Sequence, residues 1–309
     1  YTVYANNTGG SANTNIDITV IDVPPSSIGY SNSPFSLTKD SAFSSGIPSS
    51  GGGPVVTWSV SPTLPNGLSI DSNTGEISGT PDTITLSGTY TITATNTGGS
   101  DSVTITIEVN DVIPSNVAYN PNTFVETKGS AMTPVTPTAN GGDVTSWAVY
   151  PSLPSGISID ATTGEISGTP NALSTITTYT VYANNSGGSA NTSIVITVND
   201  VAPSSISYSP STFVGTRDSA MTSVTPSSTG GPVVTWSISP NLPSGLNFDT
   251  STGEISGPPS VISPSTSYTI TAENTGGSST AIIDIIVNDI IPSSITYSQT
   301  SFTETKGTA

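Results

Sequence analysis

Apolar and polar residues alternate along much of the chain with a period of two. In residues 102–110 every second residue is Val or Ile, and the residues between them are polar. This period predicts a β-strand that buries one face. A similar run occupies 90–95, and Asn96-Thr97-Gly98-Gly99 lies between the two runs. Its glycines accept positive φ angles, so the segment predicts a hairpin turn.

Shorter runs of the same kind fill the preceding part of the sequence, at 28–30, 35–37, 55–60, 67–70 and 76–78. No stretch has useful helical periodicity, and Gly and Pro recur every few residues. About seven short strands separated by turn signals predict an all-β antiparallel sandwich. Trp58 and Tyr90 suit an immunoglobulin-like core without its disulfide. A small β-barrel is the alternative fold.

All these features repeat at a spacing of 89 residues, as Trp58, Trp147 and Trp236 illustrate. The repeat divides the chain into a partial unit, three complete units and a second partial unit: 1–22, 23–111, 112–200, 201–289 and 290–309. We therefore expect a segment of a longer chain of tandem domains.

The junctions between units are short. Residues 109–114 read Val-Asn-Asp-Val-Ile-Pro, with no flexible Gly/Ser tract, and proline restricts both its own φ and the preceding residue. The sequence thus predicts sandwiches joined by stiff junctions.

The charge balance excludes some partners. The chain has four basic and 21 acidic residues, which gives a net charge of −17. An even negative charge argues against nucleic acid and anionic membranes as partners, and it leaves cations as plausible ones. We expect no membrane insertion within these residues.

Catalytic chemistry is also limited. The chain has no cysteine and no histidine, so it lacks disulfides, thiol nucleophiles, Ser–His–Asp triads and the usual zinc ligands. Paired carboxylates recur at Asp71 and Glu76, but they flank one tight turn, which the aspartate is placed to cap. We expect no enzyme.

A longer motif carries a family resemblance. The run LPNGLSIDSNTGEISGTP (64–81) recurs at 153–170 and 242–259. It resembles the signature of the He_PIG family of immunoglobulin-like domains, close to the cadherin-like group, which occurs in tandem on large bacterial and archaeal surface proteins. The resemblance implies an immunoglobulin-like sandwich, an extracellular or cell-surface location and no reaction.

These features together predict a structural protein, a rod, stalk or filament that associates with copies of itself in a fibre or at the cell surface. The alternatives are an adhesin module that binds a glycan or a protein, and non-catalytic repeats of a larger secreted enzyme.

Calcium is the candidate cofactor. Val-Asn-Asp at the junctions resembles the Asn-Asp element of cadherin linkers, which implies Asp111, Asp200 and Asp289 as ligands. Asp22 is a weaker candidate, because Ile21 replaces the asparagine. The other acidic elements of cadherin linkers are missing, so a capped, solvated turn is the alternative.

One position per unit is basic: Lys39, Lys128, Arg217 and Lys306. A Lys39–Asn110 isopeptide bond promoted by Glu76 is one hypothesis, but arginine at 217 cannot form such a bond. An ion pair between the basic residue and one of the recurring carboxylates is the hypothesis that applies to all four copies.

Three asparagines, Asn6, Asn184 and Asn191, lie in N-x-[ST] sequons. They predict glycan attachment if the organism glycosylates secreted proteins. Chance occurrence in a chain rich in Asn, Ser and Thr is the alternative.

Overall fold

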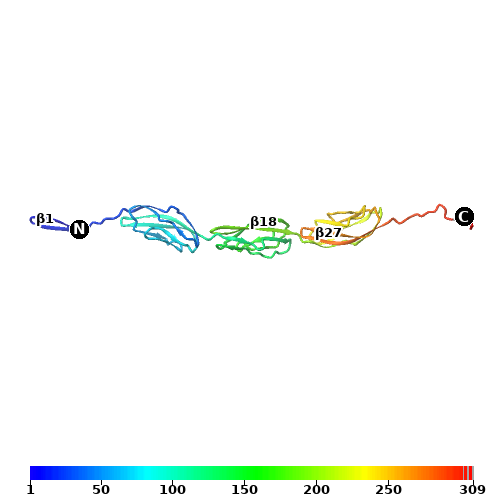
Figure 1. Cartoon of the computed structure of the whole chain (residues 1–309), viewed down its shortest axis with the longest axis horizontal. Coiled ribbons are helices and arrows are strands. Elements are labelled where there is room, and N and C mark those ends of the chain that lie inside the picture. Colours follow the sequence, from blue (N-terminus) through cyan, green and yellow to red (C-terminus); the bar gives the residue numbers. More distant parts are fainter. Residues whose placement is uncertain (302, 305, 308–309) are drawn as a thin grey trace.

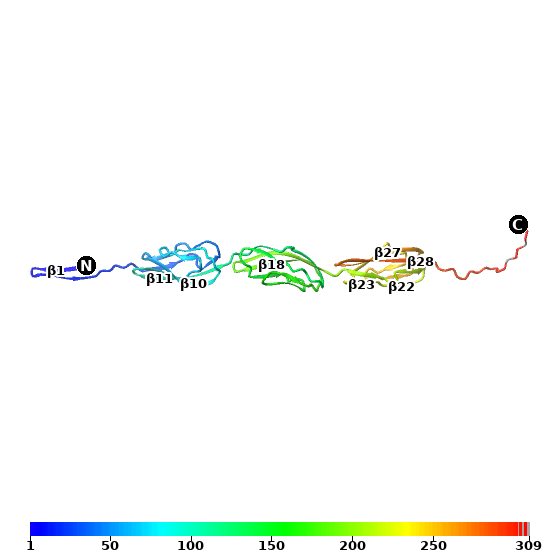
Figure 2. The same ribbon diagram turned by 90° about the horizontal axis from the view of Figure 1, so that it is seen from below.

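The computed structural model describes residues 1–301, 303–304 and 306–307, and every regular element among them is a strand. Three β-sandwiches follow one another along the long axis of the molecule, with the N-terminal hairpin at one end and the C-terminal segment at the other (Figures 1 and 2). The predicted partial unit 290–309 extends beyond these residues at 302, 305, 308 and 309.

The N-terminal residues form a separate hairpin of β1 (Thr2–Asn7) and β2 (Gly10–Asn15). Every residue of both strands is exposed.

In the first unit the strands are β3 (Pro25–Gly29), β4 (Phe35–Thr38), β5 (Phe43–Ser44), β6 (Ser49–Gly52), β7 (Thr57–Ser61), β8 (Leu68–Ile70), β9 (Ile77–Gly79), β10 (Thr85–Asn96) and β11 (Gly99–Asn110). A four-stranded main sheet has the order β4-β11-β10-β7. The opposite layer contains the pair β3-β6 and the three-stranded sheet β5-β9-β8.

The second unit contains β12 (Ser115–Ala118), β13 (Thr123–Thr127), β14 (Thr138–Asn140), β15 (Ser146–Tyr150), β16 (Ile157–Ile159), β17 (Ile166–Gly168), β18 (Ser174–Asn185) and β19 (Gly188–Asn199). Its main sheet has the order β13-β19-β18-β15, and β12-β14 and β16-β17 form the opposite layer.

The third unit contains β20 (Pro203–Ser207), β21 (Thr212–Thr216), β22 (Met221–Val224), β23 (Ser227–Gly230), β24 (Thr235–Ser239), β25 (Asn247–Phe248), β26 (Ile255–Gly257), β27 (Ser263–Asn274) and β28 (Gly277–Asn288). The order β21-β28-β27-β24 repeats in its main sheet, opposite β20-β23 and β22-β26-β25. The predicted all-β fold of tandem immunoglobulin-like sandwiches is confirmed.

Two details differ from the expectation. The paired long strands have 12 residues each, because pairing extends beyond the alternating runs, back to Thr85 in β10 and up to the turn at Gly99 in β11. Each main sheet also has one parallel edge, where β4 lies beside β11 with Phe35 opposite Ile107. This parallel pair arises because β3 lies in one layer and β4, which follows it closely, lies in the other.

The core of each unit is centred on a contact between tryptophan and glycine. Trp58 is 5% exposed, and a Cβ built on Gly75 would lie 2.6 Å from its ring. Gly75 has φ +78°, a conformation that side chains disfavour. The Tyr30 hydroxyl donates a hydrogen bond to the Gly75 carbonyl at 2.5 Å. The glycine of the repeated TGEI motif is therefore a packing requirement.

The same arrangement recurs in the other units, where Tyr119 bonds to Gly164 and Tyr208 to Gly253, each at 2.6 Å. Burial raises the pKa of Tyr30 to about 12 and raises the pKa values of Tyr119 and Tyr208 in the same direction. The phenols thus remain neutral hydrogen-bond donors.

Candidate functional site at the junctions between units

A single peptide group connects the first unit to the second. The Asn110 carbonyl accepts a hydrogen bond of 2.8 Å from the Lys39 N–H, within the first unit. The adjoining Asp111 N–H donates to the Ser186 hydroxyl at 2.9 Å, in the hairpin turn of the second unit. A peptide group is planar and rigid. The group between Asn110 and Asp111 is therefore held by the first unit at its carbonyl and by the second unit at its N–H.

The next junction has the same construction. The Asn199 carbonyl accepts from the Lys128 N–H at 2.8 Å, and the Asp200 N–H donates to the Thr275 hydroxyl at 2.9 Å. At the start of the first unit, the Asp22 N–H likewise donates to the Thr97 hydroxyl at 3.0 Å. The Thr97 hydroxyl also lies 2.7 Å from Asp22 Oδ2.

An asparagine in each hairpin turn donates a hydrogen bond to the residue that follows the junctional aspartate. The side-chain amide of Asn185 donates to the Val112 carbonyl at 2.7 Å, and the Gly142 N–H donates to the same carbonyl at 3.1 Å. The equivalent amides, Asn96 to Val23 and Asn274 to Val201, have lengths of 2.7 and 2.8 Å. Each asparagine also closes its own turn, as Asn185 Oδ1 does by accepting from the Gly187 N–H.

Glycine permits this close approach. A Cβ on Gly187 would lie 2.0 Å from the Asp111 carbonyl oxygen, and Gly98 and Gly276 would each place one 1.9 Å from the equivalent oxygen. No side chain fits at these distances.

The three predicted calcium ligands lie at separate junctions, and each carboxylate accepts a hydrogen bond from the N–H of the next residue. Oδ1 of Asp111 accepts from the Val112 N–H at 2.8 Å, and Asp200 and Asp289 bond to the following N–H in the same way, at 2.9 and 2.8 Å. Asp111 is only 7% exposed. Across the described residues, no three Asp, Glu, His or Cys side chains gather as a metal site would require. Calcium at the junctions therefore stays a prediction.

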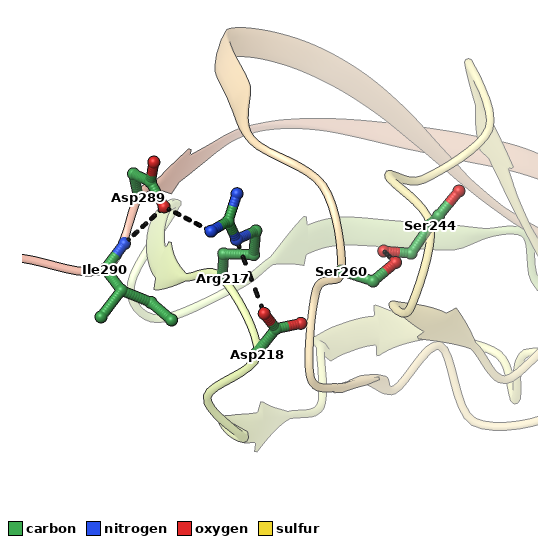
Figure 3. Close-up of polar contacts among 6 residues, drawn as sticks. All are labelled: Arg217, Asp218, Ser244, Ser260, Asp289 and Ile290. Atoms are coloured by element: carbon green, nitrogen blue, oxygen red, sulfur yellow. Dashed lines mark hydrogen bonds and ion pairs between the residues drawn. The ribbon is translucent and has the colours of Figure 1, made fainter.

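The basic position forms an ion pair only where it is arginine, among the residues that the structure describes. Arg217 Nη2 lies 3.0 Å from Asp289 Oδ1, and its Nε lies 3.5 Å from Asp218 Oδ2 (Figure 3). The forked guanidinium reaches both carboxylates, whereas the Lys39 and Lys128 side chains pair with none. The prediction of an ion pair in every copy is wrong for these lysines, since the shared feature is the main-chain bond to the last strand.

The isopeptide hypothesis also lacks the required contacts. Glu76 Oε1 accepts from the Ser44 hydroxyl at 2.5 Å, while the Asn110 amide donates to the Ser36 hydroxyl at 3.2 Å. The acid and the amide therefore bond to different serines.

The repeated Asp–Glu turn is built as expected. Asp71 Oδ1 accepts from the N–H groups of Asn73 and Thr74 at 2.7 and 3.0 Å. These bonds lower the pKa of Asp71, and equivalent bonds lower the pKa values of Asp160 and Asp249. The capping role of the aspartate is confirmed.

The sequon asparagines differ in accessibility. Asn6 on β1 and Asn191 on β19 are exposed, whereas Asn184 on β18 is half-buried and lies 3.5 Å from the Ser146 carbonyl. Glycosylation stays a prediction at all three.

The residues that hold the junction were not predicted. Ser186 and Asp111 are 75 residues apart, and no local pattern indicates their contact. Turn geometry explains the second glycine after each turn asparagine, whereas the first allows the close approach of the linker carbonyl, as Gly187 does for Asp111.

Comparison with known proteins agrees with this architecture. A family model described as "Putative Ig domain" (He_PIG) matches residues 17–110, 114–199 and 202–288. The serine-rich adhesin for platelets of Staphylococcus aureus is 31% identical over 204 residues, covering 62% of this chain and 8% of the adhesin. The chain thus corresponds to a small fraction of that relative's length.

Two solved structures are among those that the chain matches. The I-band fragment I67–I69 from titin is 16% identical, with 88% of this chain and 98% of that chain covered and a TM-score of 0.39. The N-terminal eight Ig domains of Down Syndrome Cell Adhesion Molecule are 15% identical, with 94% and 39% covered and a TM-score of 0.41. No helix in the described part of the chain has the length and apolar character needed to cross a membrane. Through its three matching repeats, the chain belongs to the He_PIG family of putative Ig domains.

Proposed function

We propose that this chain is a stiff, rod-like section of an extracellular or cell-surface protein, a stalk or fibre shaft without catalytic activity. The observation that carries the proposal is the junctional peptide group, whose carbonyl is bonded within one unit and whose N–H is bonded to the next. Similarity to a Staphylococcus aureus adhesin for platelets supports the location.

Tandem domains joined by flexible linkers move independently by default. Here three hydrogen bonds connect residues 111 and 112 to the second unit, from Ser186, Asn185 and Gly142. At about 1 kcal/mol net for each bond, they favour the docked junction by about 3 kcal/mol. That energy corresponds to a docked fraction of roughly 99%.

The same geometry argues against recognition by the loops at this end of each unit. In the first junction, the hairpin turn at 185–188 and the loop at Gly142 both contact the preceding chain. Because these loops hold the linker residues that lead in from the preceding unit, that part of their surface is not free to bind a ligand, which favours an architectural role over a loop-based adhesin module.

The contacts also refine the unit boundaries. The sequence places them after residues 22, 111, 200 and 289. We propose that each boundary lies one residue earlier, between Asn110 and Asp111 and at the equivalent positions. Asp111 would then be the first residue of the second unit, to which its N–H is bonded.

Negative-stain imaging of the whole chain tests the rod. We expect three beads in a straight line, with about 40 Å per unit from strands of 12 residues at roughly 3.3 Å each. Chains that bend freely between beads would refute it.

Calcium and self-association are separate proposals. Calcium held by Asp111, Asp200 or Asp289 would appear as heat in a calorimetric titration of metal-free protein, and an absence of binding at millimolar calcium would reject it. Self-association into a fibre would raise the mass in sedimentation with protein concentration, and a constant monomer mass would reject it.

A further inference from the structure

The second unit carries two tyrosines on the outer face of its main sheet. In β15, Trp147 is buried, while Ala148 and Tyr150 face outward, and Tyr150 is 74% exposed. In β18 the neighbours of Tyr182 are buried, and Tyr182 itself is partly exposed. Since side chains alternate along strands, both tyrosines lie on the same outer face.

Strand register brings these tyrosines close together. Ala148 is paired with Tyr182, and Tyr150 with Thr180. Tyr150 and Tyr182 are therefore diagonal neighbours, with Cα atoms roughly 7–8 Å apart in such a sheet. The small Ala148 leaves room beside the Tyr182 ring.

The other units lack this feature. Positions equivalent to Tyr150 are Ser61 and Ser239, and those equivalent to Tyr182 are Thr93 and Thr271. The core and the junctions need no tyrosine here, because the other units form both without it.

The face around the tyrosines is also uncharged, although the whole chain carries −17. Its outward residues are Ser, Thr, Ala, Asn, Val, Ile and Tyr, from β13, β19, β18 and β15. The same face holds Glu108 in the first unit, and Glu273 and Asp284 in the third. An uncharged face matches an uncharged ligand.

Area favours a saccharide over a protein. Four strands spaced by about 4.8 Å and some five residues long give a face of roughly 300 Å². A stable protein interface needs about 800 Å² per partner. A short sugar chain fits the smaller area, because its rings present apolar C–H faces to aromatic rings and hydroxyls to Thr, Ser and Asn.

We propose that this outer face of the second unit binds an uncharged glycan chain, with Tyr150 and Tyr182 as stacking surfaces. The site is independent of the junctions, so the chain could be a rod and also carry a lateral binding site. It also uses the sheet rather than the loops at the junction.

Calorimetric titration of the whole chain, from a host that does not glycosylate, tests the site. Asn191 is the register partner of Tyr182, so an attached glycan there would cover it. The probes are cellohexaose, chitohexaose and maltohexaose, with hexagalacturonate as the charged control. We expect one site for at least one neutral probe and none for the charged one.

The matched variant Y150S/Y182T introduces the residues that the first unit already has, so the fold should be kept. We expect at least tenfold weaker binding with an unchanged Tm. The reverse variant, Ser61→Tyr with Thr93→Tyr, should add a second, weaker site near Glu108. No binding of any neutral probe at millimolar concentration, preference for hexagalacturonate, or equal binding by Y150S/Y182T would overturn the proposal.

Discussion

Gly187→Ala should undock the first unit from the second without unfolding either. The added Cβ would lie 2.0 Å from the Asp111 carbonyl oxygen, where ordinary contact needs more than 3 Å. The linker must therefore move by about 1 Å, which is enough to break hydrogen bonds of 2.7–3.1 Å. Gly187 itself has no positive φ, so alanine is compatible with its turn.

The loss of these three bonds removes about 3 kcal/mol of docking free energy. A junction that is roughly 99% docked should become docked about half of the time. The perturbation is confined to one junction, so the Tm of the chain should change little.

The assay is the distance distribution between two spin labels. Ser59→Cys and Ala148→Cys are exposed, equivalent positions in consecutive units, and the chain has no other cysteine. We expect a narrow distribution in the parent chain and a broad one with Gly187→Ala.

Gly9→Ala is the matched control. Gly9 holds the same place in the N-terminal hairpin, where an added Cβ would meet only the Asn7 side chain, at 3.3 Å. It should leave the distribution narrow. An equally narrow distribution with Gly187→Ala, or a broad one in the parent chain, would refute the reasoning.

Three further predictions concern stability. Tyr119→Phe leaves the buried Gly164 carbonyl without its donor and should lower the free energy of unfolding by about 1–3 kcal/mol, measured by urea denaturation; no change would contradict the role of the hydroxyl. Burial raises the pKa of Tyr30 to about 12, so the stability that its neutral form provides should be complete below its ordinary value of 10.0 and lost as the pH rises through about 12. In acid, Asp160 has a lowered pKa, so its contribution should be present above the ordinary value of 3.8 and lost as the pH falls through the lowered one; Asp160→Asn should flatten this part of the stability profile, and an unchanged profile would argue against the cap.

The repeat and the hairpin were predictable because their signals are local. Alternation in 102–110 and the Asn96–Gly99 turn define the two longest strands, and these strands contain much of the core. The parallel edge was not predictable, because the placement of β4 depends on where the chain crosses between layers. The short strands β5 and β6 also lie outside the predicted runs, because so few residues carry little periodicity, whereas the run at 67–70 contains β8.

The junction illustrates a second limit. Proline at 114 and the absence of a Gly/Ser tract indicated a short connection, but the stabilising contacts join residues 73–75 apart in sequence. At the basic position the residue type repeats, but its side chain does not make the repeated contact. Its recurrence at Lys39, Lys128 and Arg217 indicates an ion pair, although the repeated contact is a main-chain bond that any residue except proline could make.

The central claim is that consecutive units hold a fixed orientation. Residual dipolar couplings of the whole chain, measured in a weakly aligning medium, test it most directly. We predict that the three units share one alignment tensor, in magnitude and orientation. Tensors that differ in magnitude from unit to unit would show that the units reorient independently and would contradict the account.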